Sequence, residues 1–241
     1  MGAAWKIFLM GMGQVVRDGM LLLLLPAPFL MGAALRFILP SVDGILGREF
    51  NFSLQPWYPL SDAFLLSMTP IMIAMACAFI VLDERDEGVG LYYRVTPSGG
   101  NNYLAARIGL PMIWAYFSSV VVVLLFGLAL DRILFTAAVS FMAVLQGIIS
   151  FMLLVALSGN RVEGLALAKL TNIIILGLPV PWFFEAPYKY PAGFLPSYWI
   201  GEMILFSSQR GEPIPLFPIV MGTVISLIWI AVLSRWFLRR T

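Results

Sequence analysis

The densest group of ionisable side chains is a run of five charged residues, Asp83-Glu84-Arg85-Asp86-Glu87, which directly follows an uncharged stretch. One or two charges would be enough to end an apolar span, so five in a row suit charge pairing with a partner in water. The next residues are amphipathic, with Tyr92 and Arg94 among apolar neighbours, and they end at Thr96-Pro97-Ser98-Gly99-Gly100. We predict a short amphipathic helix over Asp83–Val95, lying beneath a membrane and facing water. The alternative is a solvated loop whose acids only cap the next helix.

Catalytic and cofactor chemistry has little support elsewhere in the sequence. Histidine is absent, which removes the usual general base near neutral pH, the commonest metal ligand and Ser-His-Asp catalysis. Cys77 is the single cysteine, so an intrachain disulfide is impossible. The dipeptide Gly-Lys never occurs, so the chain has no G-x-x-x-x-G-K-[ST] nucleotide cradle. Glu185, Glu202 and Glu212 have no spacing that would fix them as an acid pair. We expect that the chain is not an enzyme and holds no metal or cofactor.

Composition places the chain in a membrane. Of its 241 residues, 61% are hydrophobic and 12% are charged, and the mean hydropathy is +0.92. Soluble domains carry about 25% charged residues. The net charge of +2 gives no reason to expect a nucleic-acid partner. We therefore predict an all-α membrane protein, with a single transmembrane domain over residues 1–241.

Charge-free runs predict the spans of this domain. A helix needs about 20 apolar residues to cross roughly 30 Å of hydrocarbon. Leu170–Phe184 has only 15 residues, but Lys169 and Glu185 flank it and can reach the interface with their side chains. This interpretation gives six transmembrane helices, at about 20–39, 63–82, 108–130, 134–157, 168–185 and 214–235.

Residues 1–19 place Trp5 and other apolar side chains among Lys6, Arg17 and Asp18, which predicts a helix lying in the membrane interface. A signal peptide is the competing interpretation. The apolar run Met20–Leu39 is longer than an ordinary signal core, and no small-residue cleavage site follows it. We therefore interpret this run as a retained first span.

The distribution of Lys and Arg predicts the orientation. With six spans, ten of the fifteen basic residues lie on the side of the two termini and the 83–107 loop. Four lie on the other side, and Arg36 lies inside the first span. The excess places both termini in the cytoplasm, in a multi-pass protein of the plasma (inner) membrane.

The predicted outer side contains two segments of some size. Ser41–Asp62 is expected to form a loop. Ala186–Glu212 is rich in proline and aromatic residues, which suit the headgroup level of a membrane. Within it, Ile200–Phe206 is too short to span, so we predict short helices that enter the outer leaflet and return, between spans five and six.

The acidic segment also carries a resemblance to a known family. Leu82-Asp83-Glu84-Arg85-Asp86-Glu87-Gly88, followed by Arg94-Val95-Thr96-Pro97, resembles the segment between the second and third membrane helices of ABC-2 type permeases, those of drug export above all. The likeness extends to the basic ends of the chain, the six spans and a second loop, Asn160–Lys169. It implies that the acidic segment is a cytoplasmic coupling helix, which rests in a groove of a separate ATPase subunit.

The same resemblance implies a set of residues and partners. Proline restrains its own backbone and that of the residue before it, so Thr96-Pro97 is also expected to fix the end of this helix, with Ser98–Asn102 as a flexible joint. Two copies of an ABC ATPase would bind ATP and Mg, and a second copy or a paralogue of the permease would complete a homo- or heterodimer in the lipid membrane. The predicted ATPase-coupling residues are Glu84, Asp86, Glu87, Gly88, Tyr92, Arg94, Thr96, Pro97, Arg161 and Glu163.

Polar residues inside the spans are few, and they are candidates for a weakly polar substrate path at the dimer interface. The alternative is hydrogen bonding between helices, at about 1 kcal/mol or less per bond. No acid lies in the middle of a span, which disfavours a proton-coupled pump. The candidate path residues are Ser67, Thr69, Gln146, Thr171 and Asn172.

Two functions remain open on the sequence. The first is the permease subunit of an ATP-driven exporter that moves a hydrophobic or amphipathic substrate, either a drug or a lipid-like molecule. The second is a self-sufficient secondary transporter or channel without an ATPase partner. Secondary transporters often contain internal repeats, and the sequence has none that we detect across the six spans. The first function also explains the acidic segment.

Overall fold

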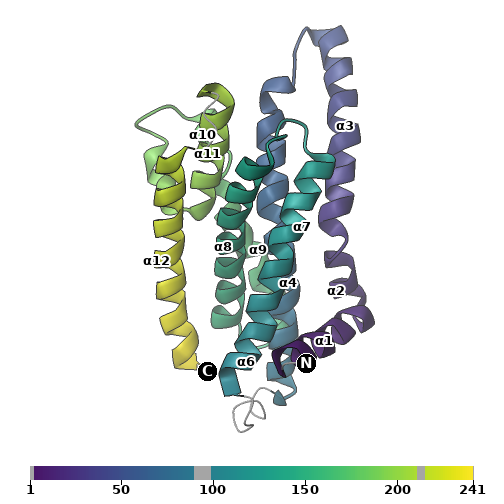
Figure 1. Cartoon of the computed structure of the whole chain (residues 1–241), viewed down its shortest axis with the longest axis vertical. Helices are drawn as coiled ribbons and strands as arrows, with labels where there is room; N and C mark the ends of the chain where they lie inside the picture. The colour runs from purple at the N-terminus through teal and green to yellow at the C-terminus, as the bar shows by residue number, and fades with distance from the viewer. Residues whose placement is uncertain (1–2, 90–98, 211–214, 241) are drawn as a thin grey trace.

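The computed structural model describes residues 3–89, 99–210 and 215–240, and within these ranges every regular element is a helix. The long helices run side by side along the long axis of the molecule (Figure 1). The α-helices are α1 Ala3–Arg17, α2 Gly19–Leu24, α3 Ala27–Phe50, α4 Tyr58–Asp86, α6 Gly99–Leu104, α7 Leu110–Phe126, α8 Ile133–Leu157, α9 Arg161–Thr171, α10 Val180–Phe183, α11 Pro196–Arg210 and α12 Leu216–Arg240. The short pieces are η1 Gln55–Trp57, the π-helix η2 Ala105–Gly109, η3 Asn172–Gly177 and η4 Tyr190–Phe194.

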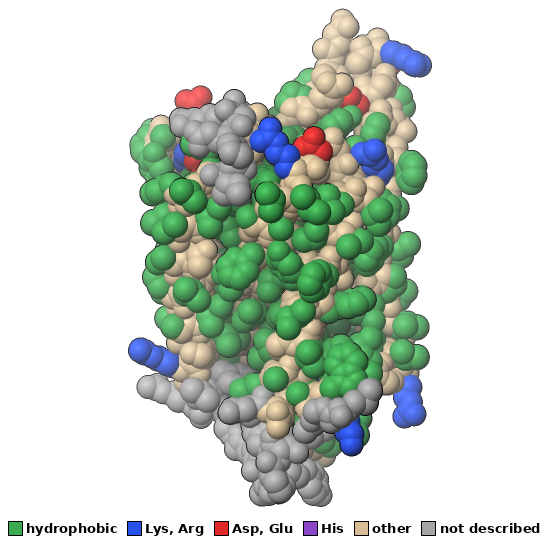
Figure 2. All heavy atoms as spheres, in the orientation of Figure 1, with side chains coloured by type: hydrophobic (Ala, Val, Ile, Leu, Met, Phe, Trp, Pro, Cys, Tyr) green, Lys and Arg blue, Asp and Glu red, His purple; other side chains and the backbone are tan. Residues whose placement is uncertain are grey.

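Five helical stretches in the described ranges are long and apolar enough to cross a membrane. Hydrophobic side chains cover the middle of the visible face, and charged side chains gather toward its two ends (Figure 2). This distribution matches a band of hydrocarbon between two aqueous phases. The five stretches are Gly19–Phe50, Gln55–Asp86, Asn102–Phe126, Ile133–Leu157 and Leu216–Arg235.

The fifth predicted span, 168–185, is not a single helix. The chain must nevertheless cross the molecule here, from the end that carries α1 and the last turns of α12 to the opposite end, which carries α10 and α11 (Figure 1). After α8, the chain returns toward the other end through α9, η3 and α10, and η4 follows before α11 begins. At 1.5 Å per α-helical and 2.0 Å per 3₁₀ residue, α9, η3 and α10 together extend about 35 Å. A broken segment can therefore cover the distance that a long helix would.

Close packing against α11 accounts for the irregular backbone of this segment. The Ser197 hydroxyl donates a hydrogen bond to the carbonyl of Ile174 in η3. A Cβ atom at Gly177 would lie 2.7 Å from that hydroxyl oxygen, and one at Gly201 would overlap the Leu178 carbonyl. The two glycines thus let the backbones of η3 and α11 touch, as small residues do between membrane helices.

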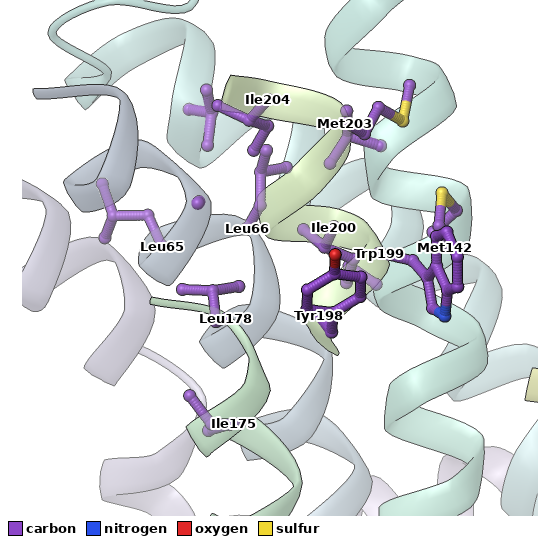
Figure 3. Close-up of a cluster of buried hydrophobic side chains, with 14 of the residues drawn as sticks. Leu65, Leu66, Met142, Ile175, Leu178, Tyr198, Trp199, Ile200, Met203 and Ile204 are labelled. Atoms are coloured by element: carbon purple, nitrogen blue, oxygen red, sulfur yellow. The ribbon is translucent and has the colours of Figure 1, made fainter. Parts of the chain in front are cut away.

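Helices α4 and α8 form the centre of the bundle. In their most apolar windows, 83% and 72% of the residues are buried, against 17% for the first stretch and 22% for α12. A Cβ atom at Gly147 in α8 would lie 3.0 Å from Pro70 in α4, so the two helices approach closely there. Toward the end of the molecule that carries α10 and α11, side chains of α11 such as Tyr198 and Ile204 pack between α4 and α8 (Figure 3).

The loop predicted over Ser41–Asp62 is mostly helical. Helix α3 continues through Pro40 to Phe50, and helical structure resumes at Gln55. Asn51 ends α3 in the left-handed conformation, with φ 49°. The Asp43 carboxylate accepts hydrogen bonds from the Leu54 N–H and, at 3.0 Å, from the Tyr58 hydroxyl, which closes the turn.

Asp62 is a buried carboxylate that holds the connection between α7 and α8. It accepts hydrogen bonds of 2.8 to 3.0 Å from the backbone N–H groups of Leu128, Ala129 and Leu130. Arg36 donates to the Gly127 carbonyl at 2.7 Å. These contacts satisfy backbone groups that would otherwise be unpaired between the two helices.

Helix α1 crosses the base of the bundle beside α2, α4 and η2 (Figure 1). Ile7, Gly11 and Val15 recur every fourth residue and are buried against the bundle. Met10 and Val16 on its other side are exposed apolar residues. The helix predicted within residues 1–19 is therefore present, and its amphipathic faces suit a membrane surface.

Candidate functional site

Charged side chains from three helices and from the α1–α2 connection meet at the end of the molecule that carries α1. Asp18 lies between α1 and α2, Asp83 to Asp86 form the last turn of α4, Arg107 lies in η2, and Arg161 begins α9. The contacts among them join the five-charge run to parts of the chain that are distant in sequence. We call this set the terminal charge cluster: Asp18, Asp83, Glu84, Arg85, Asp86, Arg107 and Arg161.

The helix predicted over Asp83–Val95 does not begin at Asp83. Helix α4 runs without a break to Asp86, and Gly88 then takes a φ of +71°, which favours glycine. Residues 90–98 lie outside the described ranges, and with them the predicted coupling residues Tyr92, Arg94, Thr96 and Pro97. Gly99 to Asn102, predicted as part of a flexible joint, are helical in α6.

Glu84 is buried and paired. Its carboxylate bonds both Nη2 and Nε of Arg107, with 3.1 Å to Nε, and accepts the Tyr103 hydroxyl at 2.9 Å. The side chains of Glu84 and Arg107 are only 2% and 4% exposed. The sequence predicted that Glu84 lies at or beside the ATPase contact, but its carboxylate faces the interior.

The π-helix η2 places Arg107 within this interior. A π-helical turn widens the helix by one residue, and such turns occur often at functional positions. Arg107 lies in this turn, between the α4 end and α1. A Cβ atom at Gly11 would overlap its guanidinium, so α1 packs directly on the Glu84–Arg107 pair.

Arg161 connects three segments. Its guanidinium bonds Asp18 and, at 2.9 Å, Asp83, and its backbone N–H donates to the Asp86 carboxylate at 3.0 Å. The hydrogen bond from Arg161 lowers the pKa of the Asp18 carboxyl, and the same bond raises the pKa of Arg161. Asp18 also caps α2 through the N–H groups of Met20 and Leu21.

The remaining contacts fix the connection between α8 and α9. Arg85 donates to the carbonyls of Val155 and Ser158, at 3.2 and 2.8 Å, where the C-terminus of α8 attracts a cation. At the start of α9, Glu163 accepts the Gly159 N–H at 2.6 Å, and the Asn160 side chain accepts the Glu163 N–H. This is a capping arrangement, so Glu163 has a structural partner.

Two acids of the five-charge run remain at the surface. Asp86 and Glu87 are exposed, and the described residues provide no partner for the Glu87 carboxylate. The other three, Asp83 to Arg85, are engaged inside the chain. The surface that this run offers to a partner is therefore narrower than five charges suggest.

The candidate path residues line none of the three best-formed cavities of the described chain. Ser67, Thr69, Gln146 and Thr171 are buried, and Asn172 is exposed. The hydroxyls of Thr69 and Thr171 bond carbonyls of their own helical segments, those of Leu65 and Ala168. In the described part of the chain, the Ser67 hydroxyl and the Gln146 amide have no hydrogen-bond partner.

The internal contacts of two cluster residues, Asp18 and Arg107, and of Asp62 outside the cluster were not predicted from the sequence. Asp18 precedes an apolar helix, which is an N-cap signal that could have been recognised. Arg107 and Asp62 each adjoin a charge-free run and were interpreted as loop charges. No local signal distinguishes a charge that ends a span from one that folds inward, because its hydrogen-bond partner is distant in sequence. Arg107 bonds residue 84, and Asp62 bonds residues 128 to 130.

The geometry of the cluster suits mechanical connection between segments. Ion pairs and hydrogen bonds of the cluster join the α1–α2 connection, α4, η2 and α9. Asp18, Asp83 and Glu84 pair with arginine side chains, and Asp86 accepts the backbone N–H of Arg161. Among the described residues, no group of three His, Cys, Asp or Glu side chains could hold a metal ion. A movement of the α4 end would therefore be passed to α1, α7 and α9 together.

Comparisons with known proteins agree with a membrane transport role. Residues 12–234 match the family described as "Fluoroquinolones export permease protein Rv2686c-like". Two curated relatives are the fluoroquinolones export permease proteins Rv2686c and MT2760, from Mycobacterium tuberculosis strains H37Rv and CDC 1551. Each is 29% identical over 224 residues, which cover 92% of this chain and 88% of the relative. No solved structure matches the chain.

Proposed function

Because the chain belongs to the Rv2686c-like family of fluoroquinolones export permease proteins, we propose that it is the membrane subunit of an ATP-driven drug exporter. The predicted resemblance to drug-export permeases is confirmed by this membership. The observation that carries the proposal is the match over residues 12–234, which covers all five membrane-crossing stretches nearly in full.

The energy source in this proposal is a separate ABC ATPase, present in two copies, which binds ATP and Mg. The permease itself has no nucleotide cradle and catalyses nothing. Asp86 and Glu87, exposed where α4 ends, support a docking surface at this end of the molecule. The segment that follows Gly88 would supply the rest of the coupling helix.

The topology in this proposal has six crossings, with α9, η3 and α10 together making the fifth. Two observations support it: the ends of the chain lie together, and the broken segment extends about 35 Å. The excess of Lys and Arg at that end assigns it to the cytoplasm. Helix α1 would then lie in the inner interface, and α11 would lie in the outer leaflet.

The substrate in this proposal is a hydrophobic or amphipathic molecule. The relatives are named for the export of fluoroquinolones. The scarcity of charges within the membrane-crossing stretches supports a path for molecules of this kind. We therefore assign drug-like amphiphiles to the chain as its substrate class.

A second permease copy or paralogue would complete the path. An apolar cavity of about 480 Å³ lies between α3, the start of α4 and η3, lined among others by Phe64 and Leu176. The predicted interface involved the second and fifth spans, and this cavity draws on both. Asn172 in η3 is the exposed candidate on this segment, so it is the polar residue that we assign to the path.

One experiment tests the ATPase partner and the number of permease copies together. The tagged permease is expressed in its own host, extracted in mild detergent and purified. Native mass spectrometry then measures the mass of its complex. We expect a mass equal to two permeases of this size and two ATPase subunits. The released ATPase should hydrolyse ATP.

Two results would contradict the proposal. A chain that purifies alone, and remains alone when the detergent is replaced by lipid nanodiscs, would remove the ATPase partner. A complex with one permease would remove the paired path and leave the ATPase assignment in place.

A further inference from the structure

An apolar cavity of about 300 Å³ lies where α1 crosses the base of the bundle. Its walls come from α1, the α2–α3 turn, α4 and the η2–α7 segment, and they include Trp5, Phe8, Met12 and Trp114. Sites for small molecules measure roughly 300 to 1,000 Å³ and are mostly apolar with few polar groups. The cavity has the size and lining of a small-molecule site.

Arg107 is the single charged residue among those that line this cavity. Two of its nitrogens, Nε and Nη2, bond Glu84, as described above. The third, Nη1, lies against Gly11, another lining residue, and finds no acceptor among the described residues. Because Arg107 lines the cavity, an oxygen atom of a ligand bound there can accept a hydrogen bond from Nη1.

We propose that this cavity binds a drug-like amphiphile with a flat aromatic body and one carbonyl or carboxylate oxygen. The ring system lies among Trp5, Phe8 and Trp114, because aromatic pairs prefer offset or edge-to-face contact. The oxygen accepts a hydrogen bond from Nη1 of Arg107. This inference rests on the proposed export function and names the substrate class of an inner-side binding site.

The location suits a substrate that arrives from the membrane. Helix α1 forms one wall, and its exposed apolar residues place the cavity beside lipid rather than in the bundle centre. The bound oxygen would lie next to the Glu84–Arg107 pair, which joins α4 to η2. A ligand bound in this cavity would therefore directly contact the terminal charge cluster.

The test is equilibrium dialysis of norfloxacin, a fluoroquinolone, against the purified permease in nanodiscs, with no ATPase or ATP present. Gly11→Ala places a methyl group onto the Arg107 guanidinium, and Gly13→Ala is its control, because a Cβ there meets nothing within 4 Å. Trp114→Ala removes an aromatic wall. Its control is Phe117→Ala, since both side chains are 60% exposed on α7 and Phe117 does not line the cavity.

We expect the Kd to rise at least tenfold in Gly11→Ala and Trp114→Ala, and to stay within twofold of wild type in both controls. If Gly11→Ala fails to fold, as judged by gel filtration, the α7 pair decides. Equal affinity in all four variants would overturn the proposal, as would wild-type protein that binds no norfloxacin.

A second arm separates a drug from a lipid chain. Spin-labelled lauric acid that binds in a manner dependent on Gly11 and Trp114, while norfloxacin binds independently of both, would overturn the proposal and assign the cavity to lipid. These binding measurements contain no ATPase. A negative result would therefore contradict only the binding site, and the mass of the ATPase complex would still test the export function separately.

Discussion

Glu84 and Arg107 form an ion pair that water scarcely reaches, and its energetics differ from those of a surface pair. Removing one partner of a buried pair leaves a charge unpaired in a poorly polar environment, at a cost of roughly 3 to 5 kcal/mol. Replacing both partners removes the charges together and costs less. The pair also holds Tyr103 and lies under α1, so its loss loosens three elements.

We therefore expect Glu84→Gln and Arg107→Gln each to lower the stability of the permease by about 3 kcal/mol or more, and the double variant to lose less than the sum. Thermal unfolding in detergent measures the three variants. Lys189→Gln is the control, since its pair with Glu202 is more exposed and should contribute about 1 kcal/mol or less. Strictly additive losses would show that the two side chains act independently.

The five-charge run is visible in the sequence, but the residue types alone did not predict which side chains its members would contact. Five successive charges fit a water-facing surface, and they also fit a helix end whose sides meet different elements. Successive residues of an α-helix point about 100° apart, so Asp83, Glu84 and Arg85 reach α9, η2 and the α8 end in turn. The contacts depend on which helices surround α4, and a single sequence does not contain that information.

At the scale of elements, the last turn of α4 is both a structural hub and the start of the proposed docking segment. Its inner residues are paired within the chain, and Glu87 is exposed with no partner among the residues that the structure describes. Charges at the rim of an interface mainly govern the rate and salt dependence of association. The proposed contact with the ATPase should therefore be sensitive to the charge of Glu87 and insensitive to distant charges.

Glu87→Lys should weaken binding of the co-purified ATPase severalfold and make it less dependent on salt, because an attraction is lost. Glu49→Lys is the matched control, an exposed glutamate at the opposite end of the molecule. Surface plasmon resonance at two salt concentrations measures both variants. If Glu87→Lys and Glu49→Lys behave alike, the ATPase does not contact the α4 end.

The membrane-crossing helices were predicted well where the apolar run in the sequence was long. Five of the predicted spans overlap helical stretches of at least 20 residues, although the predicted span 108–130 extends past the end of α7 at Phe126. Their ends were less predictable, because backbone hydrogen bonding does not stop at the membrane surface, and α3 continues through Pro40 and Asp43 to Phe50. The fifth span was the shortest run, and contacts with α11 at Gly177 and Gly201 decided its shape.

For the whole molecule, the distribution of burial explains why one chain is an incomplete transporter in this account. Helices α4 and α8 are enclosed, while the first stretch and α12 expose most of their apolar residues. Part of that surface faces lipid, and the face with the 480 Å³ cavity is assigned to a second copy. The cavity under α1 adds a binding site on the inner side of each copy.

The most direct test of the central claim is ATP-driven transport in inside-out proteoliposomes. The permease, the ATPase that co-purifies with it, or both are reconstituted, and norfloxacin uptake is followed with ATP. A hydrolysis-deficient ATPase is the control. We predict uptake only when the permease, the active ATPase and ATP are all present. Uptake by the permease alone, driven by an imposed proton gradient and indifferent to the ATPase, would contradict the account.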